Sequence, residues 1–544
     1  MKKLLLLLLI LFSINFAFAQ EQENKYQAGE IHGNFQFDAQ NYFEDTIIGA
    51  QDVPERVRMN SFANINYTRG NFKAGIRYES YQKPLLGFDP RYNGSGITYR
   101  YASYELDGLE FTVGNFYEQF GTGLIFRSYE ERGLGIDNAM DGVRLRYKPT
   151  KGVYLKAVIG QQRFFFEKGE GIVRGLDAEI NLNETFSNIF NGKTSYILGG
   201  SVVSKYQADQ NPLKILPENV AAFAGRLNVI TPKINFYTEY AYKINDPSFT
   251  NRYIYKPGSA LFASATYSDG PLSIMTSAKY VDNMDFKSNR DADGNVLLIN
   301  YLPAITKQYT YAFAAFYPYA TQPNGEFGYQ AEISYNFKKG STFGGKYGTL
   351  LSVQYSHVSS LDTTRITGGL GYELNGISKG KVLMYEDIEV VLTKKINNKW
   401  KGSATYMYQV FNKDVVQGLS GYGMLYTHIW ILEGQYKINK KYTIRAEAQQ
   451  MYTKQDEGQW AMALLEYTVS PHWFFAVFDQ FNYNNPKNSK REVHYITGTF
   501  GYIRNSTRIA LSYGKQREGY LCVGGVCRLI PAANGVGVSV TTSF

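Results

Sequence analysis

The chain has 544 residues and a formal net charge of +9, a mild excess for this length, and no run of Lys or Arg of the kind that binds nucleic acid. Aromatic residues make up 16% of the chain, and the mean hydropathy is −0.32. A chain that is polar on average yet this rich in aromatic residues is typical of a transmembrane β-barrel, in which lipid-facing and lumen-facing residues alternate. The alternative, a secreted all-β propeller, is disfavoured because no blade-length repeat is found.

Residues 1–19 are predicted to be a secretory signal peptide. Lys2 and Lys3 precede an apolar run from Leu4 to Leu11, and Ala17-Phe18-Ala19 supplies a cleavage site of the A-x-A type. No Cys follows this site, which argues against a lipid anchor, and no later apolar run approaches the ~18 residues of a membrane helix. Residues 20–30 are predicted to be a short periplasmic N-terminus, too short to hold a plug domain.

Residues 31–544 are predicted to form one all-β domain, an antiparallel transmembrane β-barrel. Ile31, Gly33, Phe35 and Phe37 alternate with polar neighbours, as expected for a strand whose successive side chains point to opposite faces. The same alternation recurs in residues 72–79, 143–148, 176–183, 327–337, 442–449 and 509–513.

Short turns and long polar loops follow one another along the chain. Turns are expected near residues 70, 108, 150, 232, 270, 340, 398, 440, 470 and 505, and long loops at 81–96, 119–141, 282–295, 359–379 and 515–534. Periplasmic turns are short and extracellular loops long in such barrels. We therefore expect both termini in the periplasm and an even number of strands, about 26 with an error of roughly two. Residues 282–380 leave the side of their turns open.

The last stretch, Gly535 to Phe544, alternates strictly between one apolar face and one small polar face. Val536, Val538, Val540 and Phe544 lie on the apolar face. A C-terminal strand that ends in Phe is similar to the signal by which outer-membrane barrels are recognised for insertion. We therefore expect outer-membrane lipid and the barrel-assembly machinery as partners, and we expect this strand to close the barrel against the first one.

A barrel of this size is too wide to be filled by the side chains of its own strands. Residues 116–139 are too rich in Gly and charge for a lipid-facing strand and too apolar for a loop in solvent. They predict a segment that folds into the barrel and narrows it, with Arg and Glu paired across the lumen; an ordinary packed extracellular loop is the alternative. The candidate constriction residues are Glu118, Arg127, Glu130, Glu131, Arg132 and Asp137.

Cys522 and Cys527 are the two cysteines of the chain, and they flank Val-Gly-Gly-Val in the last long loop. Because an exported protein meets oxidising conditions, this pattern favours a disulfide that closes a hairpin tip over a redox or metal role.

No catalytic residues, metal site or cofactor are predicted, and we do not expect an enzyme. Residues 376–380 match the G-x-S-x-G pattern, but that pattern needs a strand-turn-helix context, and a loop is expected there. The acidic stretch 285–295 offers oxygens to Ca²⁺ but lacks the closing Glu of a calcium loop, which favours a solvated turn.

Four stretches carry a resemblance to a known family: I-H-G-N-F-Q-F-D-A-Q-N-Y-F from Ile31, G-N-F-Y-E-Q-F-G-T-G-L-I-F-R-S-Y-E-E-R-G-L-G-I-D-N-A from Gly114, Y-P-Y-A-T-Q-P-N-G-E from Tyr317, and G-Y-L-C-V-G-G-V-C-R-L-I-P-A-A from Gly519. They resemble an uncharacterised outer-membrane barrel family of Bacteroidota, classed as a domain of unknown function. The resemblance implies the fold and a location in the outer membrane of a Gram-negative bacterium. It implies no activity, and no site residue is carried over.

Two functions fit these observations. The first is a passive or gated channel for small polar solutes, supported by the alternation of Arg, Lys, Glu, Gln and Asn on the expected lumen face. The second is a plugged scaffold barrel that holds a surface lipoprotein or a secretion-system component on its long loops. Deleting Gly121 to Gly133 is expected to raise ion conductance if residues 116–139 narrow the lumen.

Overall fold

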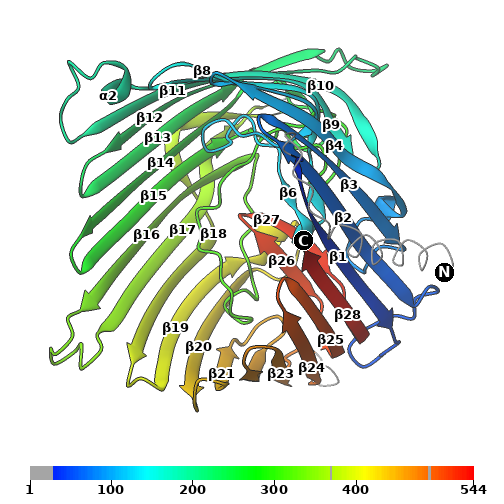
Figure 1. The fold of residues 1–544 in the computed structure, drawn as a ribbon, viewed down its shortest axis with the longest axis vertical. Helices are drawn as coiled ribbons and strands as arrows, with labels where there is room; N and C mark the ends of the chain where they lie inside the picture. Colours follow the sequence, from blue (N-terminus) through cyan, green and yellow to red (C-terminus); the bar gives the residue numbers. More distant parts are fainter. Residues whose placement is uncertain (1–27, 368–370, 488–491) are drawn as a thin grey trace.

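Strands with alternating apolar and polar residues make up most of the structure, which is a computed structural model describing residues 28–367, 371–487 and 492–544 (Figure 1). The predicted signal peptide lies outside the described residues. The principal sheet has 24 strands, and each pairs antiparallel with its neighbours along the chain. The last strand pairs with both β25 and β1, so the sheet closes into a barrel without free edges. The predicted fold is confirmed, and 24 strands lie within the expected error.

The first half of the barrel wall consists of β1 Glu30–Tyr42, β2 Val57–Arg69, β3 Phe72–Gln82, β4 Gly94–Leu106, β5 Leu109–Phe116, β8 Met140–Thr150, β9 Val153–Phe164, β10 Glu167–Asn181, β11 Ser195–Tyr206, β12 Asn219–Ile230, β13 Ile234–Lys243 and β14 Gly258–Asp269. The second half consists of β15 Leu272–Asp282, β16 Gly325–Phe337, β17 Thr349–Arg365, β18 Tyr372–Lys395, β19 Trp400–Asn412, β20 Met424–Lys437, β21 Tyr442–Tyr452, β22 Gln459–Val469, β23 Trp473–Asn484, β24 His494–Arg504, β25 Thr507–Gln516 and β28 Ala533–Ser543.

Outside the wall, the described residues form two small hairpins and four short helices. The hairpins are β6 Glu130–Glu131 with β7 Ile136–Asp137, and β26 Gly519–Val523 with β27 Val526–Ile530; the helices are η1 Pro90–Tyr92, η2 Arg132–Leu134, α2 Leu182–Thr185 and α3 Lys413–Gln417. No helix of the described ranges is long and apolar enough to cross a membrane.

The two rims of the barrel differ in their connections. At the terminal rim, where β1 begins and β28 ends, most strands are joined by tight turns such as residues 70–71, 107–108, 151–152 and 505–506. Asp107 and Gly108 have φ angles of 47° and 79°, the left-handed backbone that tight hairpin turns require. The opposite end, here called the distal rim, carries most of the longer connections. The predicted alternation of short and long connections therefore corresponds to these two rims.

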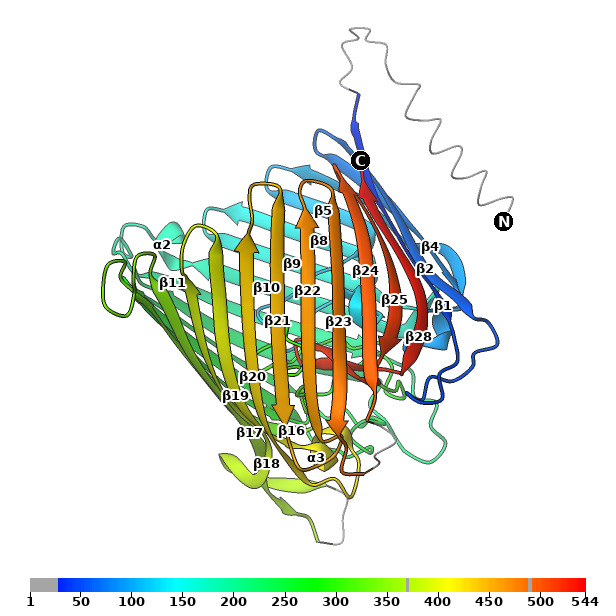
Figure 2. The same cartoon turned by 90° about the horizontal axis from the view of Figure 1, so that it is seen from below.

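One expected long loop is absent. Residues 359–379 were expected to be a loop, but β17 continues to Arg365 and β18 starts at Tyr372. Their pairing continues, with register shifts, to Arg365 opposite Tyr372, and forms a hairpin that projects beyond the wall (Figure 2). The G-x-S-x-G match at residues 376–380 therefore lies in a strand, which is also not the context of a nucleophile.

The two faces of the wall have opposite character. On β16, Tyr329, Ile333 and Tyr335 are exposed on the outer face, whereas Gln330 is buried and points inward. Exposed apolar side chains cover the outer face around the barrel; among them are Leu176, Phe223, Leu392, Leu432, Val477 and Leu511. Such an apolar exterior around a closed sheet, with every strand edge paired, is how β-proteins satisfy their backbone groups in a membrane.

Candidate functional site

The lumen is occupied by three of the chain's own connections (Figure 1). We name them by their flanking strands: the β5–β8 segment is residues 117–139, the β15–β16 segment is residues 283–324, and the β25–β28 segment is residues 517–532. The first contains β6, η2 and β7, and the last contains the β26–β27 hairpin.

The β5–β8 segment packs on the inner wall through apolar side chains. Phe120, Leu124 and Phe126 are fully buried in one cluster with inward-facing residues of β9 to β15. The wall is shaped for this contact at Gly175 of β10, where a Cβ atom would lie 2.7 Å from the ring of Phe120. A segment buried in this way is part of the protein core and not a loop in solvent.

Charged groups fix the end of the same segment. Asp137 accepts from Arg163 Nη1 at 2.5 Å and from the Tyr117 hydroxyl at 3.0 Å, and it also pairs with Arg77. Glu79 of β3 joins both guanidinium groups, at 2.7 Å to Arg77 Nε and 2.6 Å to Arg163 Nη2. Burial disfavours the charged carboxylate, yet Arg163 and Arg77 hold the pKa of Asp137 below its ordinary value. The network is buried on both the segment and the wall.

The start of the segment is held by a second group of charges. Glu118 accepts from Arg146 Nε at 2.7 Å and from Lys156 Nζ at 3.1 Å. Burial raises the pKa of Glu118, but the Arg146 and Lys156 charges outweigh it and lower the pKa overall. Thr122 donates from both its backbone amide and its hydroxyl to Glu239 of β13, each at 2.7 Å.

The candidate constriction residues pair differently from the prediction. Arginine and glutamate were expected to pair across the narrowed lumen, but Glu118, Glu130 and Asp137 pair with cations of the wall they lie against. Arg132 pairs with Glu130 at 2.7 Å within the segment, and Glu131 caps the backbone amide of Gly133. These are local pairs because the segment follows the wall instead of crossing free space.

Arg127 has a separate role. Its guanidinium lies over the rings of Tyr129 and Tyr301, at 4.5 and 4.1 Å from the ring centroids. Tyr301 belongs to the β15–β16 segment, and the backbone amide of Arg127 donates to the carbonyl of Ile299 at 2.8 Å. The predicted residue Arg127 therefore joins two internal segments.

The sequence predicted a long loop at residues 282–295, but it did not predict that the β15–β16 segment lies in the lumen. Three wall lysines donate to its backbone carbonyls: Lys205 to Lys287, Lys243 to Asp285, and Lys279 to Pro303. All three lysine side chains are fully buried. Pro303, Pro318 and Pro323 are the sequence feature that argues against a wall strand in this segment, because proline is excluded from central strands.

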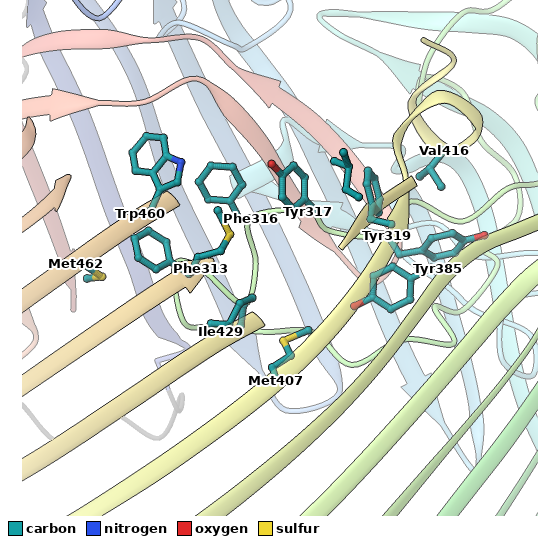
Figure 3. Close-up of a cluster of buried hydrophobic side chains, with 14 of the residues drawn as sticks. Phe313, Phe316, Tyr317, Tyr319, Tyr385, Met407, Val416, Ile429, Trp460 and Met462 are labelled. Atoms are coloured by element: carbon teal, nitrogen blue, oxygen red, sulfur yellow. The ribbon is translucent and has the colours of Figure 1, made fainter. Parts of the chain in front are cut away.

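Further along, the β15–β16 segment forms an apolar cluster with the opposite wall (Figure 3). Phe313 and Phe316 each contact the ring of Trp460 of β22, with centroids 6.3 and 5.3 Å apart. Tyr317 stacks on Phe411 of β19 and donates its hydroxyl to Asp456 at 3.1 Å. This segment thus covers the inside of the barrel from β16 to β22.

The β26–β27 hairpin contacts the other internal segments. Cys522 and Cys527 form a disulfide at its tip. The Tyr301 hydroxyl donates to the carbonyl of Gly524 at 2.8 Å, and the amide of Thr321 donates to the carbonyl of Gly525 at 2.9 Å. The hairpin was expected on an extracellular loop, and the structure folds it onto the β15–β16 segment.

The structure gives no support to a Ca²⁺ site in the acidic stretch 285–295. Asp285 is buried. The ammonium of Lys287 donates to the carbonyls of Ala292 and Gly294 at 3.0 and 2.8 Å, so these oxygens already contact a positive charge. Within residues 28–367, 371–487 and 492–544, no group of His, Cys, Asp or Glu has the arrangement of a metal site.

The C-terminal residues form the seam of the barrel. Val536, Val538 and Val540 lie on β28 opposite Asn41, Ala39 and Phe37 of β1. Phe544 exchanges two backbone hydrogen bonds of 3.0 Å with Gly33, and a Cβ atom at Gly33 would lie 2.5 Å from the Phe544 ring. The structure places these residues where the two ends of the sheet meet.

One family model, described as a family of unknown function (DUF6029), matches residues 1–544. No curated protein matches the sequence. Similar solved structures include the siderophore receptor PirA from Pseudomonas aeruginosa, at 9% identity over 96% of this chain and 81% of that chain with a TM-score of 0.43. OccK11 (OpdR) from the same organism has 7% identity, coverages of 96% and 99%, and a TM-score of 0.30.

Proposed function

The chain belongs to the family of unknown function DUF6029, and we propose that it is an outer-membrane barrel, closed at rest, that passes small polar solutes when its internal segments move. The observation that carries the proposal is the set of contacts that joins the three internal segments to the wall and to one another. A lumen occupied in this way supports a gated channel over a permanently open one.

The outer face of the barrel supports the proposed location. Its exposed apolar side chains and complete strand pairing suit lipid on all sides. We place the terminal rim in the periplasm of a Gram-negative bacterium of the Bacteroidota, after export through a cleaved signal peptide and insertion by the barrel-assembly machinery. No catalytic step is part of the proposal.

The polar cavities between the wall and the internal segments support the choice of small polar solutes. One cavity of ≈ 500 Å³ is lined by residues of β1 to β5 and β8, and another of ≈ 740 Å³ is lined by residues of β9 to β14. Both contain Arg or Lys together with Glu and Asn or Gln. Small polar molecules fit such surroundings better than apolar ones.

A plugged scaffold that holds a surface lipoprotein or a secretion component is the second candidate. The observation that favours it is the apolar cluster around Phe313, Phe316 and Trp460, which is packed like a protein core. Displacing such a cluster exposes several aromatic side chains, each worth roughly 1.5–3 kcal/mol when fully buried. In the scaffold, the segments stay in place permanently.

Single-channel conductance in a planar bilayer separates the two candidates. We expect the wild-type barrel to be closed for most of the recording with brief openings, and the deletion of Gly121 to Gly133 to give steady current, because it removes the residues that bind Glu239 and Tyr301. A matched control deletes Asn211 to Ile215, an exposed stretch of the β11–β12 connection on the distal rim. Steady wild-type current would overturn closure at rest, and silence in all three folded barrels would favour the scaffold.

A further inference from the structure

We propose that the ≈ 500 Å³ cavity in the lumen binds a small hydroxylated solute that carries a carboxylate or phosphate group. This inference rests on the proposed function, because it names the class of solute that the barrel takes. The cavity lies on the inner side of β1 to β5 and β8, next to the start and the end of the β5–β8 segment.

The cavity has an excess of positive charge. Its lining contains five cationic side chains and two carboxylates, namely Lys73, Arg77, Arg132, Arg144 and Arg146 with Glu110 and Glu130. Each carboxylate is shared between two guanidinium groups. Glu110 pairs with Arg144 and with Arg146, and Glu130 pairs with Arg77 and with Arg132. Arg77 also pairs with Glu79 and Asp137, and Arg146 also pairs with Glu118. Among the described residues, Lys73 and Arg144 have no such further carboxylate, and their incompletely neutralised charge favours an anion.

Some of these cationic donors are available to a ligand. Lys73 is exposed to the cavity, and no described residue forms an ion pair or hydrogen bond with its ammonium. Arg144 donates to Tyr117 and Thr112 at 3.1 Å each, but its Nε is buried and has no acceptor. A buried donor without a partner costs free energy that an incoming oxyanion recovers.

The register of the wall places these donors in one row. Lys73 lies opposite Ser103, Ser103 opposite Thr112, and Thr112 opposite Arg144. Neighbouring strands are ~4.8 Å apart, so Lys73 and Arg144 stand ~14 Å apart at the backbone and their long side chains can reach the same small molecule. The Ser103 and Thr112 hydroxyls lie between them, 2.9 Å from each other.

Neutral polar groups line the neighbouring rows. Asn34, Asn64 and Asn66 present amides, and Tyr99 and Tyr101 present hydroxyls. At Gly75 a Cβ atom would lie 2.5 Å from both Asn66 Oδ1 and the Tyr101 ring, so any larger residue there would clash with these two side chains. Amide and phenol groups at this density suit the hydroxyl groups of a sugar-like solute.

Isothermal titration calorimetry of the purified full-length barrel in detergent tests the inference with three probes: glucose 6-phosphate, gluconate and glucose. We expect the two anions to bind and glucose to bind at least tenfold more weakly. Lys73→Gln is expected to weaken binding of the anions roughly tenfold, the loss of one charge-assisted hydrogen bond. Because exposed charges are screened by salt, binding is also expected to weaken as NaCl is raised.

The matched control is Lys440→Gln, an exposed lysine in the β20–β21 turn away from the cavity, which should leave binding unchanged. Heat-modifiable gel mobility verifies that each variant is folded. Equal binding of glucose and the anions, no binding by the folded wild type, or an equal loss in both lysine variants would overturn the site. Binding of one anion alone identifies its group, phosphate or carboxylate, as the one recognised. Calorimetry measures binding independently of conductance. A barrel that binds the anions but never conducts would therefore refute gated passage and still support the binding site.

Discussion

At the scale of single residues, the internal segments depend on charges that are removed from water. Asp137 shows this most clearly, because Arg77, Arg163 and Tyr117 all direct their polar atoms at one carboxylate. Glu79 pairs with the same two guanidinium groups, those of Arg77 and Arg163, so each charge in the network has more than one partner. In such a network, removing one member leaves others buried and unpaired, which costs more than the pair itself contributes.

Asp137→Asn is expected to lower the free energy of unfolding by about 3 kcal/mol, since Arg77 and Arg163 keep their charge in a buried place with Glu79 as the remaining carboxylate. Urea unfolding followed by Trp fluorescence measures the change. The control is Asp52→Asn, which breaks the exposed pair with Arg56 at 3.2 Å and is expected to cost under ~0.5 kcal/mol. Equal losses in the two variants would contradict the buried network.

The lowered pKa of Asp137 adds a pH dependence to this comparison. A carboxylate whose folded pKa lies below its ordinary 3.8 contributes its stabilisation above pH 3.8 and loses it as the pH falls through the lowered value. The difference between wild type and Asp137→Asn should therefore be constant from pH 7 to pH 5 and shrink only under acid below pH 3.8.

At the scale of elements, the internal segments reach far into the barrel. The Tyr311 hydroxyl donates to Glu433 at 3.0 Å, and β20 ends four residues later at Lys437 on the terminal rim. At ~3.3 Å per residue, the β15–β16 segment therefore comes within ~13 Å of that rim along the strand. Lys307 pairs with Glu389 at 2.5 Å, six residues before β18 ends at Lys395.

The β26–β27 hairpin offers a test of how one element contributes to closure. Replacing both cysteines by serine, Cys522→Ser with Cys527→Ser, removes a short disulfide loop and is expected to cost the hairpin about 2 kcal/mol by the loop-entropy relation. Amide hydrogen exchange is expected to become faster in residues 519–530 and to stay unchanged in β10 and β22. The hydrogen bonds from Tyr301 and Thr321 remain, so the hairpin keeps its place.

Faster exchange throughout the β15–β16 segment as well would show that the disulfide, and not these hydrogen bonds, holds the hairpin in the lumen. Exchange that is unchanged at residues 519–530 would show that the disulfide contributes nothing measurable. The measurement needs no knowledge of a solute.

At the scale of the whole molecule, the barrel wall separates lipid on its outer face from the protein's own interior. β28 makes this visible at two adjacent residues: Val538 is exposed on the outer face beside Leu511, and Ser539 faces inward beside Asp38 of β1. A one-residue step therefore changes the environment from hydrocarbon to polar groups.

Val538→Arg is expected to destabilise the folded barrel in lipid vesicles by about 2–4 kcal/mol, the cost of a lipid-facing arginine near the middle of the bilayer. Ser539→Arg is expected to cost less than ~1 kcal/mol, because the lumen offers Asp38 and polar neighbours. Chemical unfolding in the same vesicles measures both. A larger loss for Ser539→Arg than for Val538→Arg would reverse the assigned faces of the wall.

The sequence by itself determined the barrel wall. Alternation along residues such as 327–337 fixes which face of a strand is apolar, and tight turns such as Asp107-Gly108 fix strand pairing between neighbours, so both are local properties of the chain. The composition and charge of residues 116–139 also indicated a segment inside the lumen. In each case the deciding information lies within a few residues of the feature.

Only the tertiary structure decided what fills the lumen and how. The β15–β16 segment has no periodic pattern, and its place depends on Lys205, Lys243 and Lys279, which come from separate strands. Likewise, Glu118 and Asp137 pair with wall residues that the closed sheet brings next to them, whereas the sequence predicted Arg–Glu pairs across the lumen. Contacts between residues far apart in the chain form only when the barrel closes, and the local sequence pattern does not predict them.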